Sequence, residues 1–252
     1  MNKNKIDKEI VKRFHGKPSF SREELFDYYK LYDPELNPRT FAWRLYDLKK
    51  KGTIQEVRKG IYKISQKQKY KPFIDERIKE IYKTVAGQYR EIKLVIWSTS
   101  WINSFSLHQT FQNFIIMETE SDVVESLFYK MKEMQIPNVF LKPDASLLKR
   151  YVVGEQEPIV IKNLITKAPT KKLDHVTVPA LEKILVDLFA DEKLFYMYQG
   201  RELKEIFRNA ITLYEINFTK MLYYAKRRGK KNGLENYLLD NFHNELEGIL
   251  ND

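Results

Sequence analysis

The amino-acid sequence predicts an α+β or α/β protein built from two domains. The first is a basic domain of three helices and a β-hairpin. The second is a larger domain with a small mixed β-sheet and a helical carboxyl-terminal part. Two observations favour this division. All of the net charge of +10 lies in residues 1–72, so that residues 73–252 are neutral overall. The apolar residues also change from helical to strand periodicity and back along the chain.

Length and composition limit the classes to which the protein can belong. A chain of 252 residues with 43% hydrophobic residues can form one or two domains with sizeable cores. It has no cysteine, which excludes disulfides, thiolate zinc sites and cysteine nucleophiles. The histidines lack metal-ligand spacing, and no phosphate loop, serine-nucleophile motif, signal peptide or long apolar run is present. We therefore expect a cytoplasmic protein with no membrane partner, no metal, no cofactor and no catalytic residue.

The first two helices are predicted from apolar spacing and from a cap. Residues at helical spacing between Ile6 and Phe14 give the first helix one apolar face. Ser21 and Glu24 have the spacing of a capping box, in which the serine hydroxyl accepts from a first-turn amide and the glutamate reaches back. The second helix begins there and ends before Pro34.

A third helix follows after a short turn. Asn37 can cap it, and Pro38 stands at the first helical position, where a missing N–H costs nothing. The helix is expected to run to Lys51 and to end at Gly52, a residue suited to a left-handed cap.

The third helix has two dissimilar faces. At 100° per residue, Phe41, Leu45 and Leu48 share one stripe and should be buried. The opposite face carries cations and aromatic rings, namely Arg39, Trp43, Tyr46 and Lys50, with Thr40 and Arg44 on its flanks. Such a face suits a helix in a DNA major groove, where cations meet phosphates or guanine edges and rings cover sugars or thymine methyls. Alternatively, the two rings pack on the neighbouring domain.

A hairpin is predicted directly after this helix. Thr53–Val57 and Ile61–Ile64 alternate apolar and polar residues around Arg58, Lys59 and Gly60. Three helices followed by a hairpin with cations at its tip are typical of a winged helix-turn-helix, here residues 1–68. We expect this domain to bind double-stranded operator DNA through the following residues: Arg39, Thr40, Trp43, Arg44, Tyr46, Lys50, Arg58 and Lys59.

The larger domain is expected to comprise residues 73–252, after a polar linker at Ser65–Pro72. Four short apolar runs read as strands: Ile92–Trp97, Phe114–Met117, Val139–Leu141 and Pro158–Ile161. Helical patterns alternate with them, which favours a small mixed sheet with helices packed on it. From Pro179 onward the chain reads as helix, including Arg201–Leu213, Ile216–Arg228 and Leu234–Leu250.

Two segments resemble a known family. Asn37–Gly52, with Ile54 and then Arg58–Tyr62, resembles the amino-terminal winged helix of AbiE-type antitoxin regulators. Val176–Leu188 looks like a helix in the carboxyl-terminal domain of that family and is expected to be a core helix. The resemblance implies a DNA-binding autorepressor and antitoxin of a type IV toxin–antitoxin, or abortive-infection, system. Its partner would be a cognate nucleotidyltransferase-like toxin.

Two alternatives remain open. One is an enzyme, a nuclease or nucleotidyltransferase targeted by the winged helix; Pro143-Asp144 and Lys162 resemble a nuclease site, but Val160 stands where a second carboxylate is needed. We expect Glu118 and Glu120 to be surface or helix-start charges, and Asp187 to hydrogen-bond locally or face solvent. The other alternative is a winged helix that docks only proteins.

One further basic run lies near the carboxyl terminus. Residues 226–231 contain five cations and are expected to end a helix, where positive charge suits the helix dipole. A minor hypothesis is that they contact RNA or an acidic toxin surface.

Overall fold

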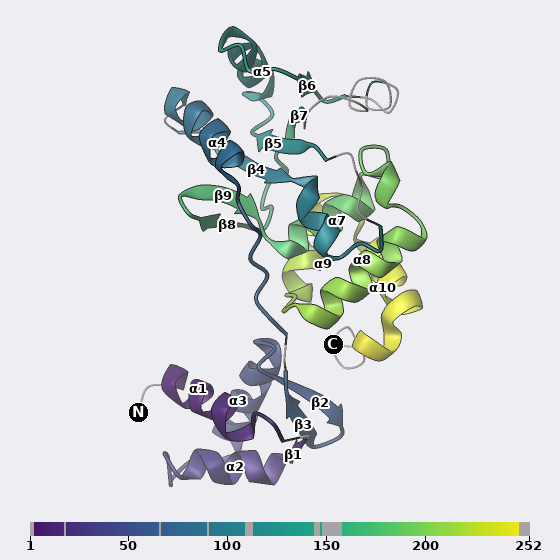
Figure 1. Ribbon diagram of the computed structural model, residues 1–252. Helices are drawn as coiled ribbons and strands as arrows, with labels where there is room; N and C mark the ends of the chain where they lie inside the picture. Colours follow the sequence, from purple (N-terminus) through teal and green to yellow (C-terminus); the bar gives the residue numbers. More distant parts are fainter. Residues whose placement is uncertain are drawn as a thin grey trace. The chain divides into compact units, whose positions relative to one another are not determined.

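The computed structural model describes residues 3–17, 19–65, 67–89, 91–108, 113–143, 147 and 158–246. Over these residues the chain is a mixed α/β protein with small sheets (Figure 1). It divides into two compact units. Unit 1 comprises residues 1–69 with 213–215, and unit 2 comprises residues 70–212 with 216–252. In the described part of the chain, no helix is both long and apolar enough to cross a lipid bilayer.

The described part of unit 1 contains three helices and one antiparallel sheet. The helices are α1 (Lys3–Phe14), α2 (Arg22–Lys30) and α3 (Pro38–Lys50). The strands are β1 (Phe20–Ser21), β2 (Ile54–Arg58) and β3 (Ile61–Ile64), in the order β1-β3-β2. The hairpin of β2 and β3 was predicted, whereas the two-residue strand β1 was not.

Side-chain caps begin α2 and α3 as predicted. The Oγ atom of Ser21 accepts from the Glu24 amide at 3.1 Å, and the Ser21 amide donates to Glu24 Oε2 at 2.7 Å. The Oδ1 atom of Asn37 accepts from the Thr40 amide at 2.8 Å. At the other end of α3, Gly52 has φ +67°, the left-handed conformation that glycine adopts without strain.

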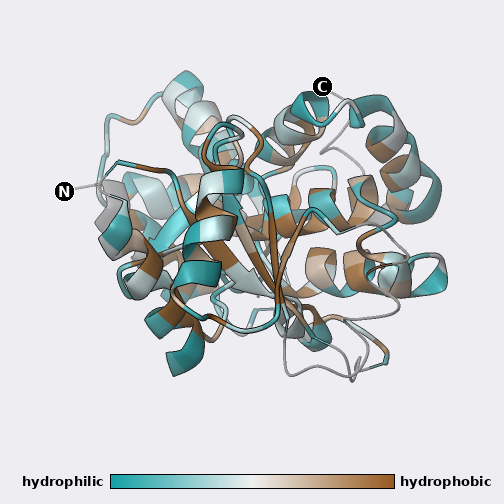
Figure 2. Cartoon of the chain, turned by 90° about the horizontal axis from the view of Figure 1, so that it is seen from above, coloured by the Kyte–Doolittle hydropathy of each residue, from teal (hydrophilic) through white to brown (hydrophobic). Residues whose placement is uncertain are grey.

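The apolar faces of the three helices pack together with the sheet. The predicted stripe of α3, consisting of Phe41, Leu45 and Leu48, is buried. Other buried members of this core are Ile6, Ile10, Phe14, Phe20, Leu25, Tyr29, Leu36, Ile54, Tyr62 and Ile64. Each helix therefore has a hydrophobic and a hydrophilic side. Figure 2 colours the chain by hydropathy and shows hydrophobic (brown) and hydrophilic (teal) residues alternating along its helices.

Unit 2 combines a mixed sheet, a hairpin and several helices. Its strands are β4 (Val95–Ser98), β5 (Ile115–Thr119), β6 (Val139–Leu141), β7 (Ile159–Asn163), β8 (Thr170–Leu173) and β9 (Val176–Pro179). Its α-helices include α4 (Glu76–Gln88), α5 (Val124–Glu133), α7 (Leu181–Ala190), α8 (Arg201–Leu213), α9 (Phe218–Arg227) and α10 (Lys231–Leu246). Short 3-10 helices occupy η1 (Thr99–Ser104) and η3 (Tyr196–Tyr198).

The larger sheet has the strand order β4-β5-β7-β6. Strand β4 runs antiparallel to β5, whereas β5, β7 and β6 are parallel to one another, so the sheet is mixed as predicted. All residues of β4 and β5 are buried, which explains why these segments read as continuous apolar runs rather than alternating ones. In the register of the sheet, Glu118 on β5 lies beside Lys162 on β7.

The prediction of one helix over Val176–Leu188 is wrong in its first part. Val176–Pro179 is strand β9, paired with β8, and helix α7 begins only at Leu181. The two-residue turn Asp174-His175 has φ of +49° and +66°, as a tight hairpin turn of this kind requires. Aspartate and histidine reach this conformation less readily than Asn-Gly, so the usual hairpin signal is missing from the sequence.

Candidate functional site

Helix α3 carries the predicted cationic and aromatic face on the side opposite its buried stripe. Arg39, Thr40 and Lys50 are exposed, and the residues Trp43 and Tyr46 are 58% and 55% exposed. We call Arg39, Trp43, Tyr46 and Lys50 the α3 face. Within it, Lys50 Nζ lies 5.8 Å from the centroid of the Tyr46 ring. This distance allows a cation–π contact between two side chains that both reach solvent.

Arg44 lies at the flank of α3 and already has a partner. Its Nη2 atom is 2.8 Å from Asp33 Oδ2, and its guanidinium lies 5.3 Å from the centroid of the Tyr29 ring. Only 19% of the Arg44 side chain is exposed. The sequence indicated a base or phosphate contact for Arg44; the structure shows that this guanidinium joins α3 to the segment after α2.

The hairpin carries the second group of predicted residues. Lys59 is exposed in the turn, and Gly60 completes the turn with φ +76°. The backbone of Arg58 ends β2, but its side chain lies outside the described part of the structure.

An ion pair fixes this hairpin to α3. Glu56 Oε2 lies 2.5 Å from Lys49 Nζ, and Glu56 Oε1 accepts from the Gly60 amide at 2.9 Å. Partial burial opposes ionisation of Glu56, but the hydrogen bonds from Lys49 and Gly60 outweigh it, so the pKa of Glu56 lies below its ordinary value. The turn that presents Lys59 is therefore held by a charged carboxylate.

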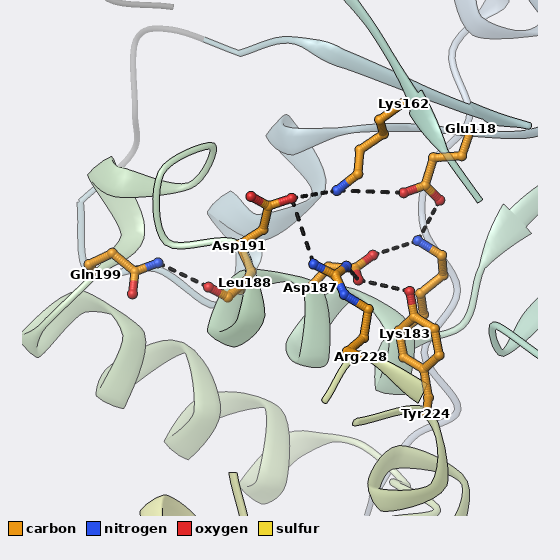
Figure 3. A network of polar contacts seen from close by, with 9 residues as sticks. All are labelled: Glu118, Lys162, Lys183, Asp187, Leu188, Asp191, Gln199, Tyr224 and Arg228. Carbon is orange, nitrogen blue, oxygen red and sulfur yellow. Dashed lines mark hydrogen bonds and ion pairs between the residues drawn. The ribbon is translucent and has the colours of Figure 1, made fainter. Parts of the chain in front are cut away.

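A second constellation, absent from the sequence predictions, lies inside unit 2 (Figure 3). We call it the ionic network. It joins side chains from two strands of the sheet and from two helices: Glu118 on β5, Lys162 on β7, Lys183 and Asp187 on α7, Asp191 just after α7, and Tyr224 and Arg228 on or just after α9.

The centre of the ionic network is Lys183, whose side chain is fully buried. Its Nζ atom lies 2.5 Å from Glu118 Oε2 and 2.5 Å from Asp187 Oδ2. The other oxygen of Asp187 lies 2.6 Å from Arg228 Nη1 and accepts from the Tyr224 hydroxyl at 2.9 Å. These contacts join β5, α7 and α9 through charged groups.

The edge of the network is more accessible to solvent. Lys162 Nζ lies 2.7 Å from Asp191 Oδ2 and 4.0 Å from Glu118 Oε1. Asp191 is 29% exposed, whereas Lys162 and Arg228 are each 13% exposed. The set contains three carboxylates, two ammonium groups and one guanidinium, so its formal charges cancel.

Burial and ion pairing shift the pKa values of Lys183 and Asp187 in opposite directions. Desolvation alone would raise the pKa of Asp187, but Lys183, Lys162 and Arg228 outweigh it and hold this pKa below its ordinary value. Desolvation alone would lower the pKa of Lys183, but Asp187 and Glu118 raise it. Burial chiefly raises the pKa of the Tyr224 hydroxyl. Lys183 therefore stays protonated and is unsuited to act as a general base or amine nucleophile.

The ionic network corrects one prediction and decides between the two parts of another. Glu118 is buried rather than a surface charge. Asp187 is fully buried and hydrogen-bonds locally, to Lys183 four residues before it, which is the first of its two predicted outcomes. Glu120 does reach the surface, where its carboxylate accepts from the Lys93 amide. Two of the residues that resembled a nuclease site are Asp144 and Lys162. Asp144 lies outside the described residues, and Lys162 is paired with Asp191.

A local signal for the ionic network does exist in the sequence. Lys183 and Asp187 stand four residues apart on the buried side of a largely apolar helix, the spacing at which side chains on one helix face meet. Glu118 likewise interrupts a buried strand. Charged residues at positions where the pattern calls for apolar ones indicate a buried ion pair, because a lone buried charge is very costly. Within the described residues, no cluster of three or more acids and histidines could hold a metal ion.

Comparison with known families places the chain in one of them. Residues 40–244 match a family that is described as a family of unknown function (DUF6577). The chain belongs to this family. The DUF6577 match begins within α3 and ends within α10, so it includes Trp43, Tyr46 and Lys50, the hairpin and the whole ionic network. No curated protein matches the chain.

Proposed function

We propose that this DUF6577 protein is a DNA-binding transcriptional regulator whose unit 1 is a winged helix-turn-helix. In this proposal α3 is the recognition helix in the major groove, and the β2–β3 hairpin is the wing that contacts the adjacent backbone. Unit 2 is the interaction domain.

The observation that carries the proposal is the exposure of Trp43 and Tyr46 between Arg39 and Lys50 on the outer side of α3. Exposed tryptophan and tyrosine rings retain apolar area in water, which favours a surface that a partner covers. The partner must also satisfy the flanking cations. A DNA groove does both, since it offers phosphates and base acceptors to cations and offers sugars and thymine methyls to rings.

The charge distribution supports a polyanionic partner. Residues 1–72 hold the whole net charge of +10. A charge excess of this kind attracts nucleic acid over a distance of about one Debye length, near 8 Å at physiological salt. The exposed α3 face and the net positive charge of residues 1–72 therefore favour the same partner, DNA.

The test is a binding titration with the DNA directly upstream of the protein's own coding sequence. The double variant Arg39→Ala with Lys50→Ala should lose the preferred site, with a loss of roughly 1–3 kcal/mol for a base-contacting arginine. The matched control, Lys12→Ala with Arg13→Ala, removes the same charge from exposed positions on α1. Equal affinity of the two double variants would contradict the assignment of the α3 face.

We further propose that the regulator is an antitoxin of the AbiE type, which represses its own operon and counteracts a nucleotidyltransferase-like toxin. The support is the resemblance of Asn37–Gly52, with Ile54 and Arg58–Tyr62, to those regulators. Co-expression with a nucleotidyltransferase-like gene from the same operon provides the test. We expect the protein to restore growth of cells that the toxin arrests; continued arrest would refute the antitoxin role and leave the DNA-binding role standing.

The same purified protein also tests the two alternatives, an enzyme and a winged helix that docks only proteins. Cleavage of plasmid DNA, or transfer of nucleotides to RNA, in the presence of magnesium would favour the enzyme. Failure to bind any duplex at low and high salt alike would favour a winged helix that docks only proteins.

A further inference from the structure

A second group of basic residues belongs to unit 2, whereas the α3 face belongs to unit 1. The segment Ile216–Leu234 contains six cations and no acidic residue, although residues 73–252 as a whole are neutral. Its exposed side chains include four cations and one aromatic ring around α9, namely Lys220, Tyr223, Lys226, Arg227 and Lys230. We call these five, with the neighbouring Lys167, the α9 surface.

The fold holds this surface in a defined shape. Asn217 caps α9, since its Oδ1 atom accepts from the Lys220 amide at 2.9 Å. The other end closes at Gly229, with φ +67°, where the Lys230 amide donates to the Ala225 carbonyl at 2.9 Å. The buried side of the helix includes Met221 and Ala225. The exposed cations thus project from a backbone that is fixed at both ends.

A hydrogen bond brings a second segment to the helix. Arg227 Nε donates to Thr166 Oγ1 at 3.0 Å, and Arg227 Nη2 donates to the same oxygen. Lys167, the residue after Thr166, is exposed, so a further cation lies one residue from this contact. No ion pair among the described residues involves Lys167, Lys220, Lys226 or Lys230.

The helix dipole accounts for only part of this charge. Cations in the last turn of a helix are stabilising, so Lys226 and Arg227 could serve the helix alone. Lys220 lies in the first turn, where a positive charge is unfavourable, and Lys167 belongs to another segment. Repulsion among these groups costs stability unless an anion covers them.

We infer that the α9 surface binds single-stranded RNA. Long cations suit a phosphodiester backbone, and Tyr223, 52% exposed between Lys220 and Arg227, presents a flat ring on which an unstacked base can lie. Stacking of this kind requires a base outside a duplex, and most single strands in a cell are RNA. An acidic protein fits less well, because a stable protein interface needs an apolar centre and Tyr223 is the one large apolar side chain exposed on the described part of α9.

The test uses the full chain and a fluorescein-labelled oligouridine of about 15 nucleotides, a length within reach of one such surface. Tyr223→Ala should weaken binding roughly 5- to 150-fold, the effect of losing one stacked base. Lys226→Gln with Lys230→Gln should reduce the slope of log affinity against log salt by about 1.4. The matched control is Lys83→Gln with Lys193→Gln, two exposed lysines of unit 2 that lie outside this surface.

Each variant is also measured in a chain that carries Arg39→Ala and Lys50→Ala, so that the α3 face contributes equally throughout. Binding of oligouridine that Tyr223→Ala and the Lys226/Lys230 pair leave unchanged would overturn the inference. So would tighter binding of oligothymidylate, or displacement of the RNA by polyglutamate of equal charge. Operator binding in these variants reports separately on the proposed regulator, so failure of one proposal is distinguishable from failure of the other.

Discussion

The ammonium group of Lys183 lies 2.5 Å from the carboxylate of Glu118, and this pair joins α7 to β5 inside unit 2. Both side chains are almost inaccessible to water. Their attraction therefore acts in a medium of low polarity, but each charge has also lost its hydration. The pair is costly to break because the buried network would then carry an unbalanced charge: Lys183 would keep only Asp187 as a close partner, and Glu118 only Lys162 at 4.0 Å.

Removal of one partner should be much more harmful than removal of both. We expect Glu118→Gln to lower the free energy of unfolding by about 3–5 kcal/mol, as for other buried pairs that lose one charge. The double variant Glu118→Leu with Lys183→Met should regain most of that loss, since Asp187 keeps Arg228 and Tyr224 as partners. Urea unfolding followed by circular dichroism measures both. A double variant as unstable as the sum of its single variants would contradict this account.

Acid should weaken the attachment of the hairpin to α3. The pKa of Glu56 is lowered in the folded state, so its contribution to stability is complete above the unfolded value near 4.5 and is lost as the pH falls through the folded value. Wild-type unit 1 should therefore lose stability below about pH 4.5 faster than the Glu56→Gln variant. Thermal unfolding between neutral pH and pH 3 provides the comparison. If the unfolding temperatures of the two proteins fell equally with pH, the ionisation of Glu56 would not contribute to stability.

Lys59 should contribute charge rather than sequence preference to DNA binding. Lys59→Ala is expected to weaken binding of all duplexes about equally and to reduce the slope of log affinity against log salt by about one. Lys12→Ala, at an exposed position on α1, is the control and should leave the slope unchanged. A loss confined to one DNA sequence would instead indicate a base contact at Lys59.

The cap of α3 should be worth a measurable amount of stability. Asn37→Ala removes the acceptor of the Thr40 amide and should cost about 0.5–2 kcal/mol. Asn37→Ser keeps an acceptor and should retain most of this stability. Equal unfolding midpoints for the alanine and serine variants would show that the cap does not determine the stability of α3.

Features that depend on neighbouring residues could be predicted from the sequence. The capping box of Ser21 and Glu24, the Asn37 cap and the glycine at position 52 each depend on residues within one helical turn. The buried and exposed sides of α3 also follow directly from helical spacing. For this reason most of unit 1 was accessible to prediction.

Features that depend on distant segments could not be predicted in the same way. Glu118 looked like a surface charge because its partner, Lys183, lies 65 positions later and meets it only after β5 and α7 pack. Strand β9 was read as helix because its hairpin turn lacks the usual glycine. The ion pair between Arg44 and Asp33 was not predicted, because the two residues meet only through the path of the chain between α2 and α3.

Strand β1 ends at Ser21, and the same residue caps α2, so no residue separates the sheet from the helix. A single residue inserted after Ser21 would rotate α2 by about 100° about its axis relative to the sheet. Leu25 and Tyr29 would then leave the interior and polar groups would enter it. Natural length variation in this region should therefore occur before Phe20, where the chain can absorb an extra residue without turning the helix.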